Sequence, residues 1–242
     1  MRRVVIGVAV AVGLVVAVAV LLLAAQPVFY RRAIAAGTGG PEGEARARRL
    51  VTKVSALHAA LTRPPARRDG DVEAGRWEAA IGAEELNAWL AIDLPRSHRA
   101  LLPDGVTAPR VGFHPRRVEV AARVGYGPVS AVAALDLEIV LRDGGQIGIA
   151  VERASLGAIP LPRDAIVRTL ADRLGRLGIA IDLRRRDGRL VLVAHVPAFG
   201  GAAEARPSIE TLAIVDGALI VAGTTAAAGR GPAGPGVGAA AP

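Results

Sequence analysis

The side chains of this sequence that could carry out chemistry are few and scattered. The four histidines, His58, His98, His114 and His195, have no second ligand at a spacing typical of a metal site. No serine lies in the Gly-x-Ser-x-Gly elbow of the α/β hydrolases. The chain has no cysteine, which excludes disulfides, thiolate zinc sites and thiol catalysis. We therefore expect a protein that is not an enzyme and that holds no metal or other cofactor.

Charged clusters also have ordinary explanations. Glu84 and Glu85 fall in the first turn of a predicted helix, where carboxylates interact favourably with the helix dipole. Arg184-Arg185-Arg186 precedes Asp187-Gly188 and predicts a basic hairpin tip, which could meet phosphates or lipid headgroups or could simply be a solvated turn. The net charge is +8, but only 3% of the residues are aromatic, so platforms for stacking bases are scarce. We expect no nucleic-acid partner.

An apolar run near the N-terminus predicts a membrane anchor. Val4 to Ala25 contains no charged residue and, at about 1.5 Å per helical residue, spans roughly the 30 Å hydrocarbon core of a bilayer. Arg2-Arg3 precedes the run, and Tyr30-Arg31-Arg32 follows it, as expected of interfacial residues. A cleaved signal peptide is the alternative, because Leu23-Ala24-Ala25 resembles a cleavage site, but signal h-regions are usually only about 7–15 residues long.

The positive charges on the two sides of this run are nearly balanced and do not fix its orientation. From the short N-terminal flank we expect a single-pass inner-membrane protein whose domain lies outside the cytoplasm. Composition then divides the chain into an anchor (1–32, with the span at 4–25), a linker (33–43), one domain (44–224) and a tail rich in Ala, Gly and Pro (225–242) that we expect to be disordered.

The hydrophobic pattern of the domain predicts an α+β fold. Residues 117–124 and 135–142 alternate between apolar and polar types, as in an antiparallel sheet covered on one face. Two further hairpins are predicted at Asp187-Gly188 and Asp216-Gly217. Helical spacing of apolar residues appears over 44–63, over 83–92 and from Pro162 onward, while 97–109 has the composition of a loop. We expect an antiparallel sheet packed against two or three amphipathic helices.

Two apolar helix faces are the candidate binding residues. Leu86, Trp89 and Leu90 share one face of the helix that begins at Ala83. Ordinary packing would put Trp89 in the core and leave Asn87 exposed, whereas a binding role would place Trp89 and Leu90 along an apolar groove. The candidate ligand-binding set, which adds one stripe of the later helix, is Leu86, Trp89, Leu90, Ile166, Leu170 and Leu174.

Two segments carry a resemblance. The helix with Glu85-Leu86-Asn87-Ala88-Trp89-Leu90 and the stretch Ser155-Leu156-Gly157-Ala158-Ile159-Pro160-Leu161-Pro162 resemble a group of single-pass proteins of high-GC bacteria. The order of anchor, helix, long hairpins and second helix is more distantly similar to anchored bacterial proteins with tubular lipid-binding-like folds. The resemblance implies a curved sheet wrapped on a helix, around an apolar ligand, and it implies no catalytic residue.

These observations lead to two functional expectations. The first is a membrane-anchored, non-enzymatic envelope protein whose domain binds a lipid or another apolar ligand. The alternative is a structural or partner-binding module of an envelope complex, for which an exposed apolar patch or a free sheet edge would be the sign. The identity of a ligand, the protein partners and the oligomeric state do not follow from the sequence.

Overall fold

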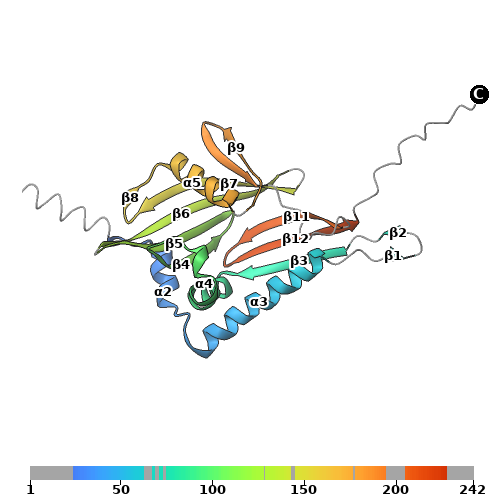
Figure 1. Ribbon diagram of the computed structural model, residues 1–242, viewed down its shortest axis with the longest axis horizontal. Helices are drawn as coiled ribbons and strands as arrows, with labels where there is room; N and C mark the ends of the chain where they lie inside the picture. Colours follow the sequence, from blue (N-terminus) through green and yellow to red (C-terminus); the bar gives the residue numbers. More distant parts are fainter. Residues whose placement is uncertain are drawn as a thin grey trace, which may run out of the picture.

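The computed structural model describes residues 24–62, 67–68, 71–72, 75–127, 129–142, 145–176, 178–194 and 205–227. These residues form an α+β fold with one large antiparallel sheet, smaller sheets and four α-helices (Figure 1). This confirms the predicted α+β class with an antiparallel sheet, although the described residues contain four helices where two or three were expected. The expected span at Val4 to Ala25 lies outside the described residues up to residue 23, as does the expected tail beyond residue 227. None of the helices in the described part of the chain is long and apolar enough to cross a bilayer.

The large sheet follows from the alternating segments of the sequence. Each neighbouring pair of its strands is antiparallel, and hairpins turn at Arg116 and at Asp187-Gly188, where the backbone adopts positive φ. In spatial order the strands are β4 (Val106–His114), β5 (Arg117–Tyr126), β6 (Val129–Arg142), β7 (Gln146–Leu156), β10 (Arg189–Ala194) and β9 (Ile181–Arg186), with the short β8 (Ile159–Pro160) paired to β7.

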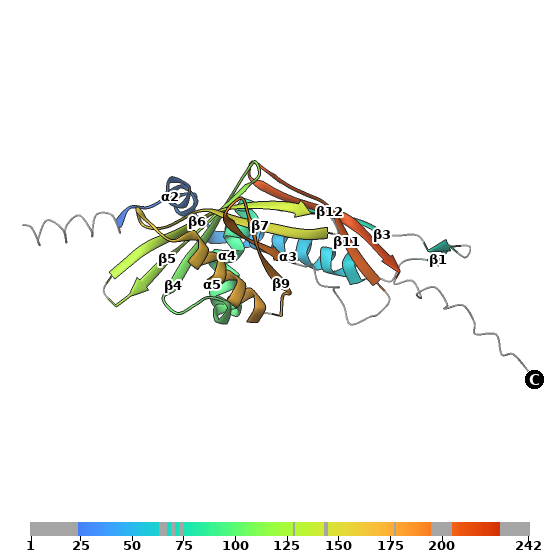
Figure 2. The ribbon, with the colours of Figure 1, turned by 90° about the horizontal axis from the view of Figure 1, so that it is seen from above.

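Helices cover both faces of the large sheet. Figure 2 shows α2 (Val28–Ala35) on one side and α4 (Ala83–Ser97) and α5 (Arg163–Arg176) on the other. On the α2 side the fully buried Tyr30 packs against Ala121, Val132 and Ala134. On the other side, alternate residues of the same strands pack against α4 and α5. The sheet therefore has apolar clusters on both faces, rather than one covered and one solvated face.

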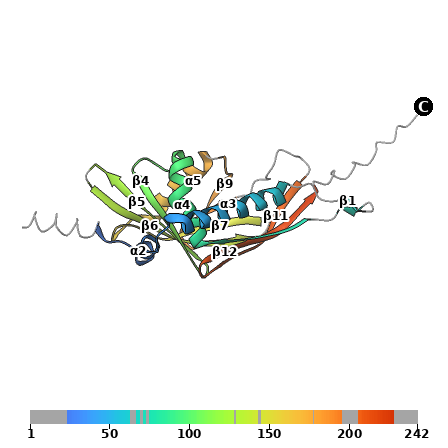
Figure 3. The same cartoon turned by 90° about the horizontal axis from the view of Figure 1, so that it is seen from below.

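A second sheet of three strands continues the fold. Its order is β11 (Ala205–Val215), β12 (Ala218–Ala227) and β3 (Gly75–Gly82), and β1 (Arg67–Arg68) pairs separately with β2 (Asp71–Val72). Backbone hydrogen bonds join its β11–β12 turn to the large sheet, from Gly217 N–H to the Phe113 carbonyl (3.0 Å) and from Arg116 N–H to the Ile214 carbonyl (3.2 Å). Figure 3 shows α3 (Gly40–Thr62), α4 and α5 on the same side of the two sheets.

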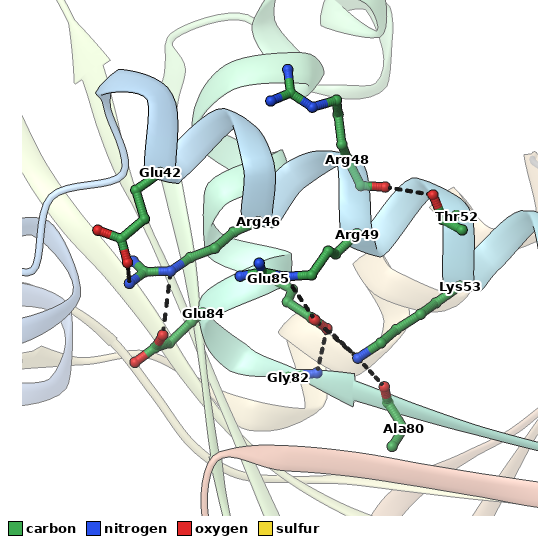
Figure 4. A network of polar contacts seen from close by, with 10 residues as sticks. All are labelled: Glu42, Arg46, Arg48, Arg49, Thr52, Lys53, Ala80, Gly82, Glu84 and Glu85. Atoms are coloured by element: carbon green, nitrogen blue, oxygen red, sulfur yellow. Dashed lines mark hydrogen bonds and ion pairs between the residues drawn. The ribbon is translucent and has the colours of Figure 1, made fainter.

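A polar network fixes α3 against the start of α4 (Figure 4). Lys53, the only lysine of the chain, donates to both carboxylate oxygens of Glu85 (2.7 and 2.9 Å) and to the Ala80 carbonyl (3.0 Å). Glu85 also accepts the Gly82 N–H (3.3 Å), which satisfies one of the free donors at the helix N-terminus. The carboxylate that the sequence assigned to the helix dipole therefore joins two helices and a strand.

Several expected boundaries are corrected. Residues 28–35 form α2, although they were expected to be split between the membrane anchor and the linker. Tyr30 holds this helix on the sheet. The helix predicted from residue 44 begins at Gly40. Residues 225–227, expected to belong to the tail, are part of β12. Thr225 is 2% exposed and pairs with Pro207 of β11 and with Gly75 of β3.

The segment between α4 and β5 is also more regular than expected. α4 continues past Pro95 to Ser97, because the side chain of Leu94 in its last turns is buried in the core. The expected loop over 97–109 contains a short 3-10 helix (Arg99–Leu101) and the start of β4. Pro109 obscured β4 in the sequence, and it lies at a bulge where the register with β5 shifts.

Candidate functional site

Five of the six candidate binding residues belong to two neighbouring apolar clusters. Leu86 and Leu90 of α4 pack with Val111, Phe113, Val118 and Ile214. Ile166, Leu170 and Leu174 of α5 pack with Val151, Ala154, Val167 and Leu192. Leu137 of β6 contacts both clusters, so the two sets of helix residues face one continuous apolar surface of the large sheet.

The middle of that surface is incompletely covered. Leu135, Leu137 and Ile139 point toward the helices from β6, in the interior of the sheet, yet each remains partly exposed. Val120 of β5 and Ile149 of β7, beside them, are partly exposed as well. We call these five residues the apolar strip. α4 packs mainly on β4, and α5 packs mainly on β7, β9 and β10, so neither helix is centred over β6.

Neither Asn87 nor Trp89 lies where ordinary packing predicted. Asn87 is buried, donating to the Val111 carbonyl and accepting the Val111 N–H, both at 2.8 Å. Trp89 belongs to neither apolar cluster and is half-buried, with its ring centroid 5.7 Å from that of His98. The expectation of a core Trp89 and an exposed Asn87 is therefore wrong, because the backbone of β4 needs a polar partner at this point of α4.

A cavity of about 580 Å³ lies between the start of α2 and the sheet. Residues 25–29 form one wall, and Glu119, Asp136 and Arg153 lie side by side on β5, β6 and β7 opposite them. The Asp136 carboxylate is 3.9 Å from Nε of Arg153, and Glu119 is 3.0 Å from Nε2 of His114. Each carboxylate thus has a basic side chain as a neighbour, and the rest of the cavity wall is made mostly of small and apolar residues.

Arg110 is a buried cation on the same face. It is 6% exposed, its Nε has no hydrogen-bond partner, and its Nη1 donates only to the Pro109 carbonyl (2.7 Å). Desolvation lowers the pKa of the Arg110 guanidinium, partly offset by the nearby Tyr30. Among the described residues no carboxylate pairs with it. No motif pointed to this position in the sequence.

The histidines remain apart. His58 lies on α3, His98 follows α4 and His114 ends β4, while His195 is outside the described residues. Within the described part of the chain, no group of three or more His, Cys, Asp or Glu residues is arranged to hold a metal ion. Comparisons of the chain with protein-family models, with curated proteins and with solved structures found no match.

Proposed function

We propose that the chain is a membrane-anchored, non-enzymatic envelope protein whose domain binds a lipid or another apolar molecule on the apolar strip. The Val4 to Ala25 run would be the anchor, and the domain would lie outside the cytoplasm. The observation that carries the binding proposal is the partial exposure of Leu135, Leu137 and Ile139 in the interior of a sheet whose face is otherwise covered by α4, α5 and the β11–β12 hairpin.

The chemistry of the strip favours an apolar ligand. Its five side chains are all aliphatic, and the walls add Leu86 and Leu90 from α4 and the Ile166, Leu170 and Leu174 stripe from α5. Covering such a surface stabilises a complex by about 25 cal/mol for each Å² of apolar area removed from water. An acyl chain supplies that area and requires no hydrogen-bond partner from these residues.

Native mass spectrometry of the full chain tests the proposal. The protein is extracted from its own membranes in a mild detergent, and released lipids are identified after organic extraction. We expect a stoichiometric apolar adduct. An apo mass that persists after incubation with membrane lipids would overturn lipid binding.

Matched variants locate the site. Leu137→Trp adds a ring at the centre of the strip, and Leu101→Trp makes the same change at an exposed position outside both clusters. If the strip is open, Leu137→Trp abolishes the adduct while the melting temperature stays close to that of the parent. A drop of more than about 10 °C for Leu137→Trp would instead reveal a fully packed core, because overpacking costs about 1–3 kcal/mol or more.

The alternative, a partner-binding module, is favoured by one edge of the large sheet. β9 ends the strand order, and no other described strand pairs with its outer side. Leu183, in the middle of β9, is exposed. Its arginines discourage unspecific pairing, so a partner strand would need complementary acidic residues. In the same extraction, a co-purifying protein that is lost in Leu183→Pro, with no bound lipid, would replace the lipid hypothesis by this one.

A further inference from the structure

A second groove lies on the face of the large sheet opposite to the apolar strip. It encloses about 490 Å³ and is floored by small and aliphatic side chains, among them Val140, Gly148 and Ala150. Its charged lining comes from β6, β7, β9 and β10 and from the turns at Arg116 and Asp187. The charged residues are Arg116, Arg142, Arg186 and Arg189 against Glu138, Asp187 and Glu152.

Each carboxylate of this groove already has an arginine. Glu152 binds Arg189 with two contacts of 2.9 Å. The other two pairs are Arg116 with Glu138 at 3.4 Å and Arg186 with Asp187 at 3.7 Å. Four arginines against three carboxylates leave one positive charge over, and the pairing shows which residue carries it.

That residue is Arg142. In the described part of the chain it forms no ion pair or hydrogen bond, and its buried Nε has no acceptor. A Cβ at Gly148 would lie 2.8 Å from this Nε, so the absence of a side chain at that position of β7 leaves room for the Arg142 side chain as it lies here. A guanidinium with five N–H donors is thus held at the groove with no counter-ion among the described residues.

Two further arginines are available to an incoming anion. The Asp187 carboxylate is 89% exposed, and its pair with Arg186 is long, so the two are held together weakly. Arg116 is likewise exposed, and its guanidinium has a single 3.4 Å contact with the Glu138 carboxylate. Both guanidinium groups can turn toward a ligand at little cost, whereas the two-contact pair of Arg189 with Glu152 stays in place.

We propose that this groove binds a phosphate group, with Arg142 as the principal contact and Arg186 and Arg116 as secondary contacts. The planar fork of N–H donors on a guanidinium matches two phosphate oxygens at once, and a phosphate has oxygens left for a second and third arginine. The phosphate can belong to a small soluble phosphomonoester or to a lipid headgroup. Because the groove and the apolar strip lie on opposite faces of the sheet, this site is independent of the proposed function.

Calorimetric titration of the detergent-solubilised full chain tests the site and its source of phosphate. Glycerol 3-phosphate represents the soluble ligand, dihexanoyl phosphatidylglycerol the headgroup, and glycerol the uncharged control. Binding of either phosphate without glycerol binding supports the site, and the better of the two identifies the source. Affinity should also rise between pH 5.5 and 7.5 for the monoester, as its second proton dissociates with a pKa of about 6.

Charge-matched variants separate a built site from general attraction. Arg142→Gln removes the unpaired charge, while Arg168→Gln removes one from the exposed surface of α5 on the other face. We expect Arg142→Gln to weaken binding at least about tenfold, and Arg168→Gln less than about twofold. If Arg142→Gln does not fold, Arg186→Gln at the exposed hairpin should weaken binding about threefold. Equal effects of Arg142→Gln and Arg168→Gln, or no binding at millimolar ligand, would overturn the proposal.

Discussion

Asn87 of α4 binds the backbone of Val111 like a neighbouring strand, donating to its carbonyl and accepting its N–H, both at 2.8 Å. Val111 lies on β4, one of the two edge strands of the large sheet, and no described strand pairs with the outer side of Val111. The only asparagine of the chain therefore closes part of a sheet edge and fixes the angle at which α4 crosses it.

Asn87→Ala should lower the free energy of unfolding by about 2–4 kcal/mol, because two buried backbone groups lose their partners at once. Urea unfolding followed by circular dichroism measures the change. Thr52→Ala is the control, since it removes only an exposed hydrogen bond within α3 and should cost less than about 0.5 kcal/mol. Equal costs for the two variants would show that the Asn87 contact contributes nothing specific.

Lys53→Met should loosen α3 from α4 and lower the free energy of unfolding by about 1 kcal/mol. The pair is half-exposed, with 41% of the Lys53 side chain and 14% of the Glu85 side chain accessible, so solvent screening reduces its strength. A double-mutant cycle with Glu85→Gln measures the coupling, which should shrink as salt rises. Arg48→Met, which removes a 3.7 Å exposed pair with Glu44, should be nearly neutral. A coupling energy near zero at low salt would contradict this role.

Arg110→Met should stabilise the fold by about 1 kcal/mol or more, since an aliphatic side chain of similar length avoids the desolvation of an unpaired buried cation. The folded-state pKa of Arg110 is lowered, which means that the charged guanidinium destabilises the fold. This cost is fully present at every pH well below the folded-state pKa. The gain should therefore be constant between about pH 5 and 9. Arg123→Met, at an exposed position of β5, should leave stability within about 0.5 kcal/mol. Destabilisation by Arg110→Met would imply that Arg110 has a partner in the folded protein.

Two glycines should respond to alanine in opposite ways. Gly175 lies inside α5 with open space where the methyl group of an alanine would lie, so Gly175→Ala should raise the free energy of unfolding by about 0.5–1 kcal/mol. At Gly223 on β12, a methyl group would overlap the Ser208 carbonyl and approach the Trp77 ring to 2.7 Å. Gly223→Ala should therefore cost more than about 2 kcal/mol. Thermal unfolding of both variants measures the difference, and melting temperatures that shift in the same direction by similar amounts would contradict the prediction.

Much of the sheet could be predicted because its strands obey short-range rules. The alternation over 117–124 and 135–142 and the Asp-Gly turns at 187–188 and 216–217 located β5, β6 and the two later hairpins. β4 was not predicted as a strand, because its bulge and Pro109 interrupt the alternation of apolar and polar residues over 106–114. α2 was missed because its only deeply buried residue is Tyr30, which looks like an interfacial residue after an apolar run.

The candidate site was less predictable, since long-range pairing decides it. The helical spacing of Leu86, Leu90 and the Ile166–Leu174 stripe correctly indicated inward faces. The burial of Asn87 was not predicted, because a single asparagine gives no sign that it will bind a strand from a later segment. Arg142 and Gly148 are likewise ordinary in sequence, and only the register of β6 with β7 brings them together.

β12, near the end of the chain, pairs along its length with β3, the first long strand of the domain, from Ala218 opposite Gly82 to Thr225 opposite Gly75. Because the ribosome synthesises β3 long before β12, β3 lacks its β12 partner while the rest of the domain is synthesised. The three-stranded sheet closes only when the C-terminal hairpin is released. Premature stop codons between residues 83 and 217 would consequently yield products in which β3 permanently lacks its β12 partner, and such partly folded chains are exposed to proteolysis.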